Sequence, residues 1–337
     1  MYFTINDEAH PYHIKSKMNF PIFLNNGKNP KWKYYLENYL KLLLPDIYYK
    51  KKAKRLLRSF NDRNDREYIQ DRVDFYNKLA EPVEIKDAIA IKDLHLKDVK
   101  QKVYFFDAYP ILRSFPKHYK FSRAFGDVVH VPASPSIVKS RPVADDNQNS
   151  VLLKLNKVRH FVRIKKDIPF SEKKDKLVFR GKVTYKEKRR KFFEMYFDHP
   201  MCDLGDTQKK KINPDEWKVN KTSIHYLLQY KFILAVEGID VASNLKWVMS
   251  SNSLAVMPKP EFETWFMESR LIPDHHYVAI KPDYSDLEEK LKYYIEHQDE
   301  AQSIIKNAQE YVNQFWDKER EHLISLLVMQ KYFRITK

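Results

Sequence analysis

The fold class is decided by residues 230–258, which run Tyr230-Lys-Phe-Ile-Leu-Ala-Val-Glu-Gly-Ile-Asp-Val-Ala-Ser-Asn-Leu-Lys-Trp-Val-Met-Ser-Ser-Asn-Ser-Leu-Ala-Val-Met-Pro258. Residues 232–236 are a short apolar run that ends at Glu237-Gly238, which is typical of a buried strand followed by a turn. Residues 254–257 form a second apolar run, closed by a proline. The stretch therefore begins and ends with a buried strand.

The segment between these two strands has helical period. Leu245, Val248 and Met249 recur at i, i+3 and i+4, and Ser243 and Asn244 are polar residues able to bind free N–H groups of the first turn. Strand, turn, helix and strand in this order predict an α/β fold. The helix then begins at the carboxyl edge of a parallel sheet, where an anion is favoured. An ordinary βαβ repeat without a ligand fits the same pattern.

Length and composition predict a globular protein with room for two domains. The chain has 337 residues, of which 43% are hydrophobic, and only five are glycine. The single Cys202 excludes an internal disulfide and fits a reducing compartment. The start of the sequence lacks the pattern of an export signal, and no run approaches the roughly 20 apolar residues of a membrane span. We expect a soluble or peripheral cytoplasmic protein.

The formal net charge of +16 predicts an anionic partner. Nucleic acid, an anionic membrane surface and a phosphorylated substrate all fit. Residues 31–79 have helical period, interrupted at Pro45, and residues 50–58 are strongly basic. Basic residues interleaved with aromatics suit an anionic membrane surface, and a solvated helix face with the aromatics packed inward is the alternative.

Asp107 is a candidate general base. Residues 102–106 are predicted to form a strand, and Asp107 follows it in the segment Asp107-Ala-Tyr-Pro110. A carboxylate just past a strand end lies at a sheet edge, where general-base chemistry is commonly placed. A turn or helix-capping role is the alternative reading of Asp107.

A second strand followed by glycine is predicted at residues 176–181, with a basic helix starting at Lys186. Guanidinium groups suit phosphate oxygens because their donors form a planar fork. Four basic residues are predicted to converge on one anion: Arg180, Lys182, Arg189 and Arg190. For Lys186, Lys188 and Lys191 we expect a solvated surface instead.

Weaker patterns predict the remaining elements. We expect strands at 126–131 and 275–280, a helix from 262 to 266, and a linker between domains at 167–176. Ser285-Asp-Leu-Glu288 has the spacing of a capping box that opens the C-terminal helices.

Several catalytic signatures are absent from the sequence. Five glycines leave no Walker A, GxGxxG or GxSxG motif, and there is no HExxH, paired CxxC or Asp-x-Asp. His10 and His13 have no third metal ligand nearby. A bound diphosphate is therefore expected to meet Arg, Lys and backbone N–H groups rather than a metal ion.

Four motifs occur in an order that identifies a family. They are Leu177-Val-Phe-Arg-Gly181, Tyr230-Lys-Phe232, Glu237-Gly-Ile-Asp-Val-Ala-Ser-Asn-Leu-Lys246 and His276-Tyr277. From about residue 103 to 317 the chain resembles glycosyltransferase family 90. The resemblance is greatest to the bacterial lipopolysaccharide core transferases and more distant to the protein O-glucosyltransferases and capsule-associated proteins.

The resemblance implies a GT-B architecture, in which two Rossmann-like domains face a cleft and C-terminal helices follow. Residues 1–166 would form the acceptor-side domain and residues 167–285 the nucleotide-sugar domain. Residues 286–337 would form helices, the last packing back on the N-terminal domain. The resemblance also implies inverting, metal-independent transfer from a UDP-sugar, with no other cofactor.

The resemblance implies roles for individual residues. Asp107 is the nearest match to the family's base, although Ala108 is an extra residue in that segment. The donor diphosphate would be contacted by Arg180, Gly181 and either Arg189 or Arg190. The later loop would add donor contacts from Glu237, Gly238, Ser243, Asn244 and Lys246. Asn244 stands where eukaryotic members have an arginine, which leaves Lys246, the helix N-terminus or a group elsewhere to neutralise charge there.

Taken together with the basic charge, the resemblance implies transfer of a hexose from a UDP-sugar to a lipopolysaccharide or lipooligosaccharide core at the cytoplasmic face of the inner membrane. Capsule polysaccharide or protein is the alternative acceptor. A basic membrane- or nucleic-acid-binding protein without catalysis is the alternative of another class. No nucleic-acid-binding signature supports the nucleic-acid reading.

Overall fold

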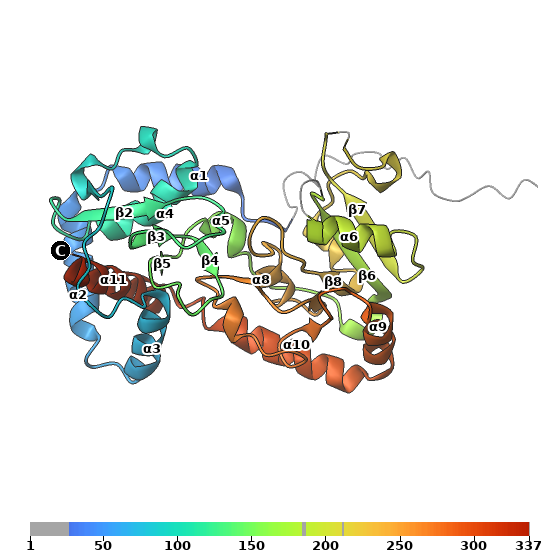
Figure 1. Cartoon of the computed structure of the whole chain (residues 1–337). Coiled ribbons are helices and arrows are strands. Elements are labelled where there is room, and N and C mark those ends of the chain that lie inside the picture. The colour runs from blue at the N-terminus through green and yellow to red at the C-terminus, as the bar shows by residue number, and fades with distance from the viewer. Residues whose placement is uncertain (1–26, 184–186, 211, 337) are drawn as a thin grey trace, which may run out of the picture.

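The computed structural model describes residues 27–183, 187–210 and 212–336 (Figure 1). His10, His13 and Lys186 lie outside these residues. The α-helices are α1 (Lys31–Leu42), α2 (Asp46–Ser59), α3 (Arg66–Tyr76), α4 (Lys102–Leu112), α5 (Lys157–His160), α6 (Glu187–Tyr196), α7 (Ile224–Leu227), α8 (Leu245–Val248), α9 (Leu287–Glu296), α10 (Gln298–Asn313) and α11 (Lys318–Ile335). The strands are β1 (Ile89–Ala90), β2 (Lys120–Ala124), β3 (Ser136–Val138), β4 (Ser140–Pro142), β5 (Ser150–Leu152), β6 (Lys174–Gly181), β7 (Cys202–Asp206), β8 (Tyr230–Leu234), β9 (Leu254–Met257), β10 (Phe262–Thr264) and β11 (Val278–Ala279).

The larger sheet is built from five parallel strands in the order β11-β9-β8-β6-β7. Phe232 lies opposite Leu177 on one side and Leu254 on the other, and all three side chains are buried. Strands buried on both faces read as continuous apolar runs, which is why residues 230–258 stand out in the sequence. The predicted strand, turn, helix and strand are confirmed as β8, α8 and β9.

A second sheet lies in the N-terminal half, in the order β1-β2-β3-β5. β2, β3 and β5 are parallel, and β1 is antiparallel to β2. Ile137 and Val151 face each other across β3 and β5 and have no exposed surface. The chain is thus a mixed α/β protein with parallel strands in two separate sheets.

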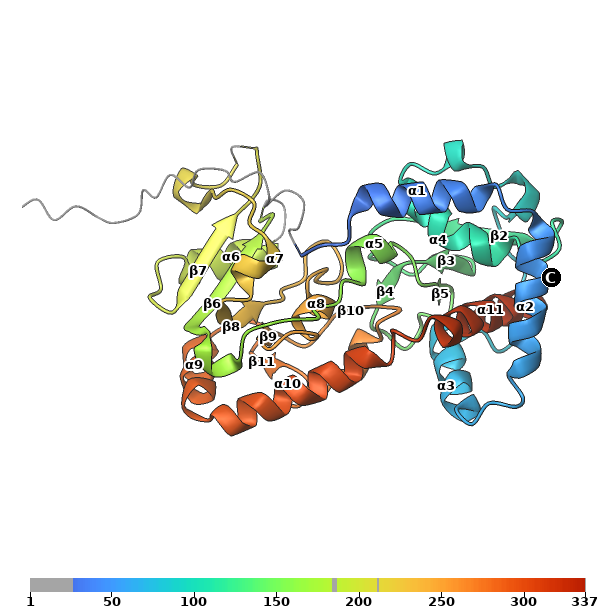
Figure 2. The same cartoon turned by 180° about the vertical axis from the view of Figure 1, so that it is seen from behind.

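The two halves of the chain are connected by a strand pair and by the C-terminal helices. β4 pairs with β10, and across this pair Arg141 Nε donates to Glu263 Oε1 at 2.7 Å with both side chains buried. α10 runs beside the larger sheet towards the N-terminal half, and α11 then packs against α2, α3 and α4 (Figure 2). The C-terminal helices therefore follow the full length of the fold.

Glu321 of α11 is the centre of a buried polar cluster. It accepts from Arg72 Nη1 at 2.6 Å, Lys154 Nζ at 2.7 Å and Trp265 Nε1 at 2.7 Å. Burial raises the pKa of the Glu321 carboxyl, but the two cations outweigh it and hold that pKa below its usual value. One carboxylate thereby joins α11 to α3, to the chain after β5 and to the chain after β10.

The strand predicted at 102–106 is wrong, because these residues begin the helix α4. Seven of the eleven residues of α4 are buried, so the helix shows no polar stripe. A short apolar run of this kind cannot be told from a buried strand by periodicity. Pro110 lies inside α4, and because proline usually interrupts a helix, its presence also argues against predicting a helix here.

Several smaller predictions are also wrong. Residues 126–131 form no strand, and residues 262–266 hold the strand β10 rather than a helix. In the segment 275–280 only Val278–Ala279 is a strand. The capping box predicted at Ser285 is not formed. Ser285 Oγ donates instead to Asp283 Oδ1 at 2.9 Å, and α9 begins at Leu287 without a side-chain cap. Local hydrogen bonds in these loops replace the regular elements that the patterns suggest.

Among the described residues, no helix combines the length and the apolar character needed to cross a membrane.

Replacing Glu321 is expected to destabilise the fold strongly. Glu321→Gln leaves the fully buried Arg72 without a counter-charge, which typically costs about 3 kcal/mol or more of unfolding free energy. Glu319→Gln on the same helix is the control, because its pair with Arg55 is mostly exposed and little stability depends on it. Urea unfolding followed by circular dichroism measures both, and equal stability of the two variants would contradict the role given to Glu321.

Candidate active site

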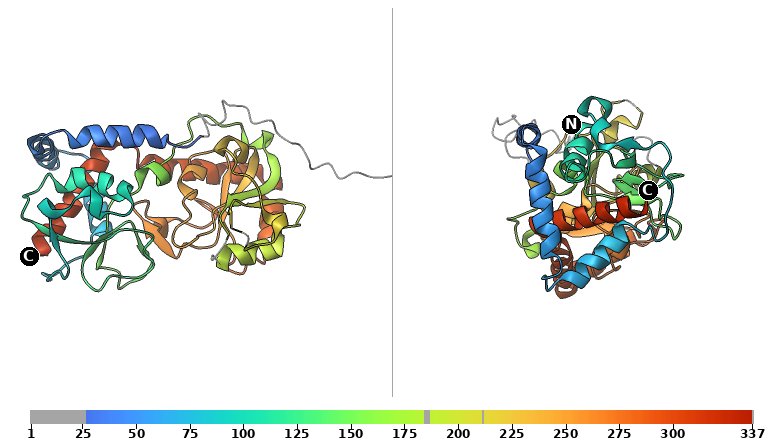
Figure 3. Two further views of the ribbon diagram at one scale, coloured as in Figure 1. Left: turned by 90° about the horizontal axis from the view of Figure 1, so that it is seen from above. Right: turned by 90° about the vertical axis from the view of Figure 1, so that its left-hand side faces the viewer.

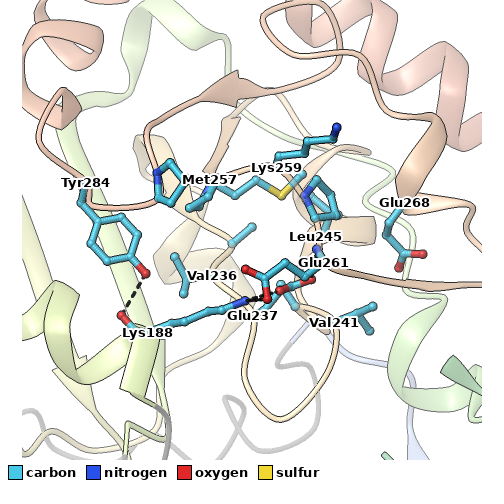
Figure 4. A pocket seen from close by; sticks show the side chains of 15 residues that line it. Lys188, Val236, Glu237, Val241, Leu245, Met257, Lys259, Glu261, Glu268 and Tyr284 are labelled. Carbon is cyan, nitrogen blue, oxygen red and sulfur yellow. Dashed lines mark hydrogen bonds and ion pairs between the residues drawn. The ribbon is translucent and has the colours of Figure 1, made fainter. Parts of the chain in front are cut away.

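A pocket opens at the carboxyl edge of the larger sheet, where β8 and β9 end (Figure 4). It encloses about 490 Å³, counting the part open to solvent. Its walls are the loops after β8 and β9, completed by Lys188 of α6, Glu268 and Tyr284. The carboxyl edge of a parallel sheet is where ligands bind in open α/β folds, so this pocket is the candidate site.

Glu237 ties the two loops of the pocket together. Its Oε1 accepts from the backbone N–H groups of Glu261 and Phe262, each at 3.0 Å, and its Oε2 accepts from Lys188 Nζ at 2.8 Å. Figure 4 shows Lys188 reaching both Glu237 and Glu261. Burial raises the pKa of the Glu237 carboxyl above its usual value, against the effect of Lys188. The expectation of a solvated Lys188 is wrong, because this side chain lines the pocket.

Arg189 is a cation held by backbone groups alone. Its Nε and Nη2 donate to the Val236 carbonyl at 3.2 and 3.0 Å, and its Nη1 donates to the Lys182 carbonyl at 3.0 Å. Within the described part of the chain, no carboxylate lies within ion-pair distance of it. Burial and the nearby charge of Arg159 lower the pKa of Arg189 to about 10, so the group stays charged at neutral pH. An uncompensated, fixed guanidinium at a sheet edge is suited to a phosphate anion.

Arg180 is committed to a different partner. Its Nη2 donates to Asp203 Oδ1 at 2.6 Å, and Tyr226 donates to the other oxygen of Asp203 at 3.0 Å. Arg190 is exposed and pairs with Glu194 at 2.8 Å. Of the four basic residues predicted to converge, Arg180 and Arg190 are therefore paired with carboxylates, whereas Lys182 contacts Arg189 through its carbonyl oxygen. Their roles in donor binding stay predictions.

Gly181 supports Arg189 through packing. A Cβ at this position would lie 2.6 Å from the ring of Phe179, so a larger residue would have to move that ring. The guanidinium of Arg189 lies over the same ring, 5.3 Å from its centroid. Lys182 is exposed and contributes its carbonyl oxygen to Arg189. The glycine turn thus shapes the place where the guanidinium rests.

The loop after β8 satisfies most of its own polar groups. The Gly238 N–H donates to the Asp240 carbonyl at 2.9 Å, and Asn244 Nδ2 donates to the Leu234 carbonyl at 2.9 Å. Lys246 is buried and pairs with Glu268 at 2.7 Å, so its charge is already neutralised. Ser243 is half-buried beside them. α8 is a single turn, so its dipole is small.

Asp107 is buried in α4 with only 3% of its surface exposed. Its Oδ1 accepts from the Tyr34 hydroxyl at 2.9 Å, and its Oδ2 accepts from the Lys157 N–H at 2.9 Å. Burial raises the pKa of the Asp107 carboxyl, partly offset by Lys157. Asp107 therefore fixes the start of α5, and its assignment as the base stays a prediction.

Sequence reasoning missed a polar cluster between the two sheets. Lys139 lies 2.5 Å from Asp127, in the loop after β2, and 2.5 Å from Asp240, in the loop after β8. Ser140 also donates to Asp240, at 2.7 Å. The carboxylate of Asp127 keeps 30% of its side-chain surface exposed. Lys139 follows an apolar pair in Ile137-Val-Lys139, a position that reads as the end of a strand rather than as a site.

His160 of α5 was missed as well. It is 2% exposed, and neither ring nitrogen has a hydrogen-bond partner among the residues that the structure describes. Burial, followed by the charges of Lys246, Lys139 and Arg159, lowers the pKa of His160 well below its usual value. The ring is therefore neutral at pH 7 and offers one donor and one acceptor, the combination that a hydroxyl group can satisfy.

The comparison with protein-family models matches residues 150–337 to glycosyl transferase family 90. The chain is 40% identical over 307 residues to the O-glucosyltransferase LpsA of Dichelobacter nodosus, which covers 90% of this chain and 96% of the relative. The chain belongs to glycosyl transferase family 90. It is also 28% identical over 165 residues to protein O-glucosyltransferase 3 of Homo sapiens, which covers 48% of this chain and 32% of that protein.

As a family 90 member, the protein is a glycosyltransferase. The family match includes the pocket loops, Arg189, His160 and the C-terminal helices, whereas Asp107 and Asp127 precede it. No group of three or more His, Cys, Asp or Glu side chains placed to hold a metal ion occurs in the described ranges.

Arg189 is expected to dominate binding of a diphosphate anion. Arg189→Gln should raise the Kd for inorganic pyrophosphate about tenfold or more, because a charge-assisted, two-pronged contact is lost. Arg190→Gln is the matched control, because Arg190 follows Arg189 on the same helix but is exposed and already paired with Glu194. Isothermal titration calorimetry measures both variants. A loss of equal size in both, or in neither, would show that Arg189 is not the anion contact.

Proposed function

We propose that this family 90 enzyme transfers a hexose from a UDP-sugar to the core of a lipopolysaccharide or lipooligosaccharide. The observation that carries the proposal is the 40% identity with LpsA along nearly all of both chains. That relative is named as an O-glucosyltransferase, so UDP-glucose is the first donor to test, and the name LpsA suggests a lipopolysaccharide-related acceptor. The net charge of +16 suits an acceptor that carries phosphates and carboxylates.

We further propose the GT-B arrangement, with the donor in the larger sheet's pocket and the acceptor on the side of the smaller sheet. Two separate sheets with parallel strands support this arrangement. The cluster of Lys139, Asp127 and Asp240 supports it too, because it brings loops from both sheets together. The expected location is the cytoplasmic face of the inner membrane, where such an acceptor is assembled.

The proposed reaction inverts the configuration at the anomeric carbon and uses no metal ion. The acceptor hydroxyl loses its proton to a carboxylate as its oxygen attacks the anomeric carbon, and the bond to UDP breaks with its electron pair leaving on the diphosphate. Arg189 would stabilise that charge, since it is the half-buried arginine at the sheet edge whose hydrogen bonds go to backbone carbonyls.

Two carboxylates are candidates for the base. Asp107 is the residue that the family resemblance implies, and its raised pKa suits proton transfer. Asp127 is the residue that the structure adds, because its side chain is partly exposed in the loop after β2 and shares Lys139 with Asp240 of the donor-side loop.

The two alternative functions differ in the support that they have. The same chemistry on capsule polysaccharide or protein is supported only by partial similarity to a protein O-glucosyltransferase. The non-catalytic basic binding protein is set aside, because the chain belongs to a family of glycosyltransferases.

The proposal predicts acceptor-dependent release of UDP. Purified protein should turn over UDP-glucose, or another UDP-hexose of a panel, in the presence of truncated lipooligosaccharide. Turnover should persist in EDTA, because Arg189 and backbone groups replace a metal at the diphosphate. A coupled UDP assay measures it, with capsule polysaccharide and peptide as control acceptors. Release of UDP with a control acceptor alone would move the function to that acceptor class.

The base is identified by comparing Asp107→Asn with Asp127→Asn. Loss of the base should lower kcat about 100-fold or more while UDP affinity is kept. A variant that loses only a positioning contact should lose stability and keep most of its kcat, since Asn still accepts hydrogen bonds through its carbonyl oxygen. Single-turnover rates and thermal unfolding distinguish the two. If both variants keep kcat, neither Asp107 nor Asp127 is the base.

A further inference from the structure

The outer face of α1 and the α1–α2 corner is strongly apolar and exposed. Trp32 is 69% exposed, Leu36 53%, Leu40 55%, Leu43 80% and Ile47 56%. The first four recur at spacings of three and four, so they share one face of the helix. These five residues, with Tyr39, Leu44 and Tyr48, form what we term the α1 face.

The α1 face is a cluster rather than ordinary surface. Of the 17 large hydrophobic residues that are exposed in the described part of the chain, eight lie between positions 32 and 48. The others, such as Ile168, Met195 and Ile272, are separated along the chain. Single exposed apolar residues need no explanation, whereas a contiguous patch marks an interaction surface.

Unpaired basic residues flank the α1 face. On α2, Lys51, Lys54 and Arg58 share the face of Ile47 at spacings of four, seven and eleven residues, and all three are exposed. On α1, Lys33 is exposed beside Trp32. None of these four has a carboxylate within ion-pair distance among residues 27–183, 187–210 and 212–336. Exposed aromatic and leucine side chains framed by uncompensated cations match the interface of an anionic bilayer, where apolar groups enter and lysines meet headgroups.

The α1 face is joined to the acceptor side of the site. Tyr34, on another side of α1, donates to Asp107, whose other oxygen holds the first N–H of α5. Asn29, just before α1, donates to the carbonyls of Val158 and Phe161 at 3.2 and 2.9 Å. α5 carries Arg159, whose charge acts on Arg189 of the site, so these bonds fix the position of the α1 face relative to the site. In Figure 3 α1 lies along an outer edge of the molecule, where a flat surface can reach it.

We propose that the α1 face docks on an anionic lipid bilayer and holds the acceptor side of the site next to the membrane. The occupant is lipid rather than a second copy of the chain, because the cations that frame the patch would repel the same cations of an identical partner. The docking does not depend on which sugar is transferred, and vesicle binding is measured without donor or acceptor. Failure of the proposed function and failure of docking are therefore distinguishable.

Vesicle flotation tests the apolar part of the α1 face. Full-length protein should float with vesicles of phosphatidylglycerol and phosphatidylethanolamine and bind much less to phosphatidylcholine. Leu36→Ser, Leu40→Ser and Leu43→Ser combined should lower the partition coefficient about tenfold or more. The control combines Ile168→Ser, Met195→Ser and Ile272→Ser, which removes three exposed apolar side chains elsewhere and should leave binding unchanged. Equal loss in both triple variants would overturn the proposal.

Charge reversal tests the basic part. Lys51→Glu, Lys54→Glu and Arg58→Glu combined should abolish the preference for phosphatidylglycerol and its sensitivity to salt. The control reverses three exposed lysines on other elements, Lys92, Lys97 and Lys306. Both triple variants should keep wild-type release of UDP with a soluble acceptor, since none of these residues lines the pocket. If the control variant loses the preference for phosphatidylglycerol to the same extent, binding depends on net charge alone, and the proposal of a specific docking face is overturned.

Trp32 reports docking directly. All five tryptophans lie in the described part of the chain, and among them Trp32 alone is exposed, because Trp217, Trp247 and Trp265 are buried and Trp316 is half-buried. Vesicles should shift its emission to the blue, brominated lipid should quench it, and Trp32→Phe should remove both signals. No quenching, or a dimer by light scattering that Leu43→Ser dissociates, would assign the α1 face to protein contact and overturn the proposal.

Discussion

The buried carboxylate of Glu321 is the contact on which the arrangement of the chain most depends. It is contributed by the last helix and receives Arg72 from α3, Lys154 from the chain after β5 and Trp265 from the chain after β10. A charge taken out of water is tolerated only with complete hydrogen-bonding partners, so these segments must meet in one geometry. Stacking of Tyr76 on Trp265, with ring centroids 3.9 Å apart, fills the space beside it. The C-terminal helix thereby fixes the smaller sheet against the larger one.

The distribution of charge at the sheet edges distinguishes Arg189 from the other basic residues. Most buried cations near the sheet edges already have carboxylates: Lys246 has Glu268, Arg180 has Asp203 and Lys139 has Asp127 and Asp240. Arg189 is held by carbonyl oxygens, which fix its position without cancelling its charge. A preorganised cation of this kind gains most from a ligand that brings its own negative charge. The charge of the sequence as a whole could not have singled it out.

Much of the larger sheet could be predicted from the sequence, and little of the smaller one. Residues 230–258 show both strands and the turn because buried parallel strands read as uninterrupted apolar runs. The helix α4 was misread because its burial on nearly all sides removes the helical period. Individual site residues were harder still, since Lys188 becomes a pocket residue only through Glu237 and Glu261, which lie 49 and 73 positions further along the chain. Local patterns carry no information on such pairings.

Asp107 shows how one residue can connect surface and site. Its two oxygens bind Tyr34 of α1 and the first N–H of α5, so they hold the helix with the exposed apolar face against the short helix with His160. A buried carboxylate at this position has a structural role even without proton transfer. Its Oδ2 accepts the hydrogen bond at the start of α5 that the side chain of Asn156 does not accept. The segment around Asp107, which the sequence analysis connected with catalysis, therefore also links α1 to α5. The positions of the α1 face and of α5 are consequences of the same buried contact.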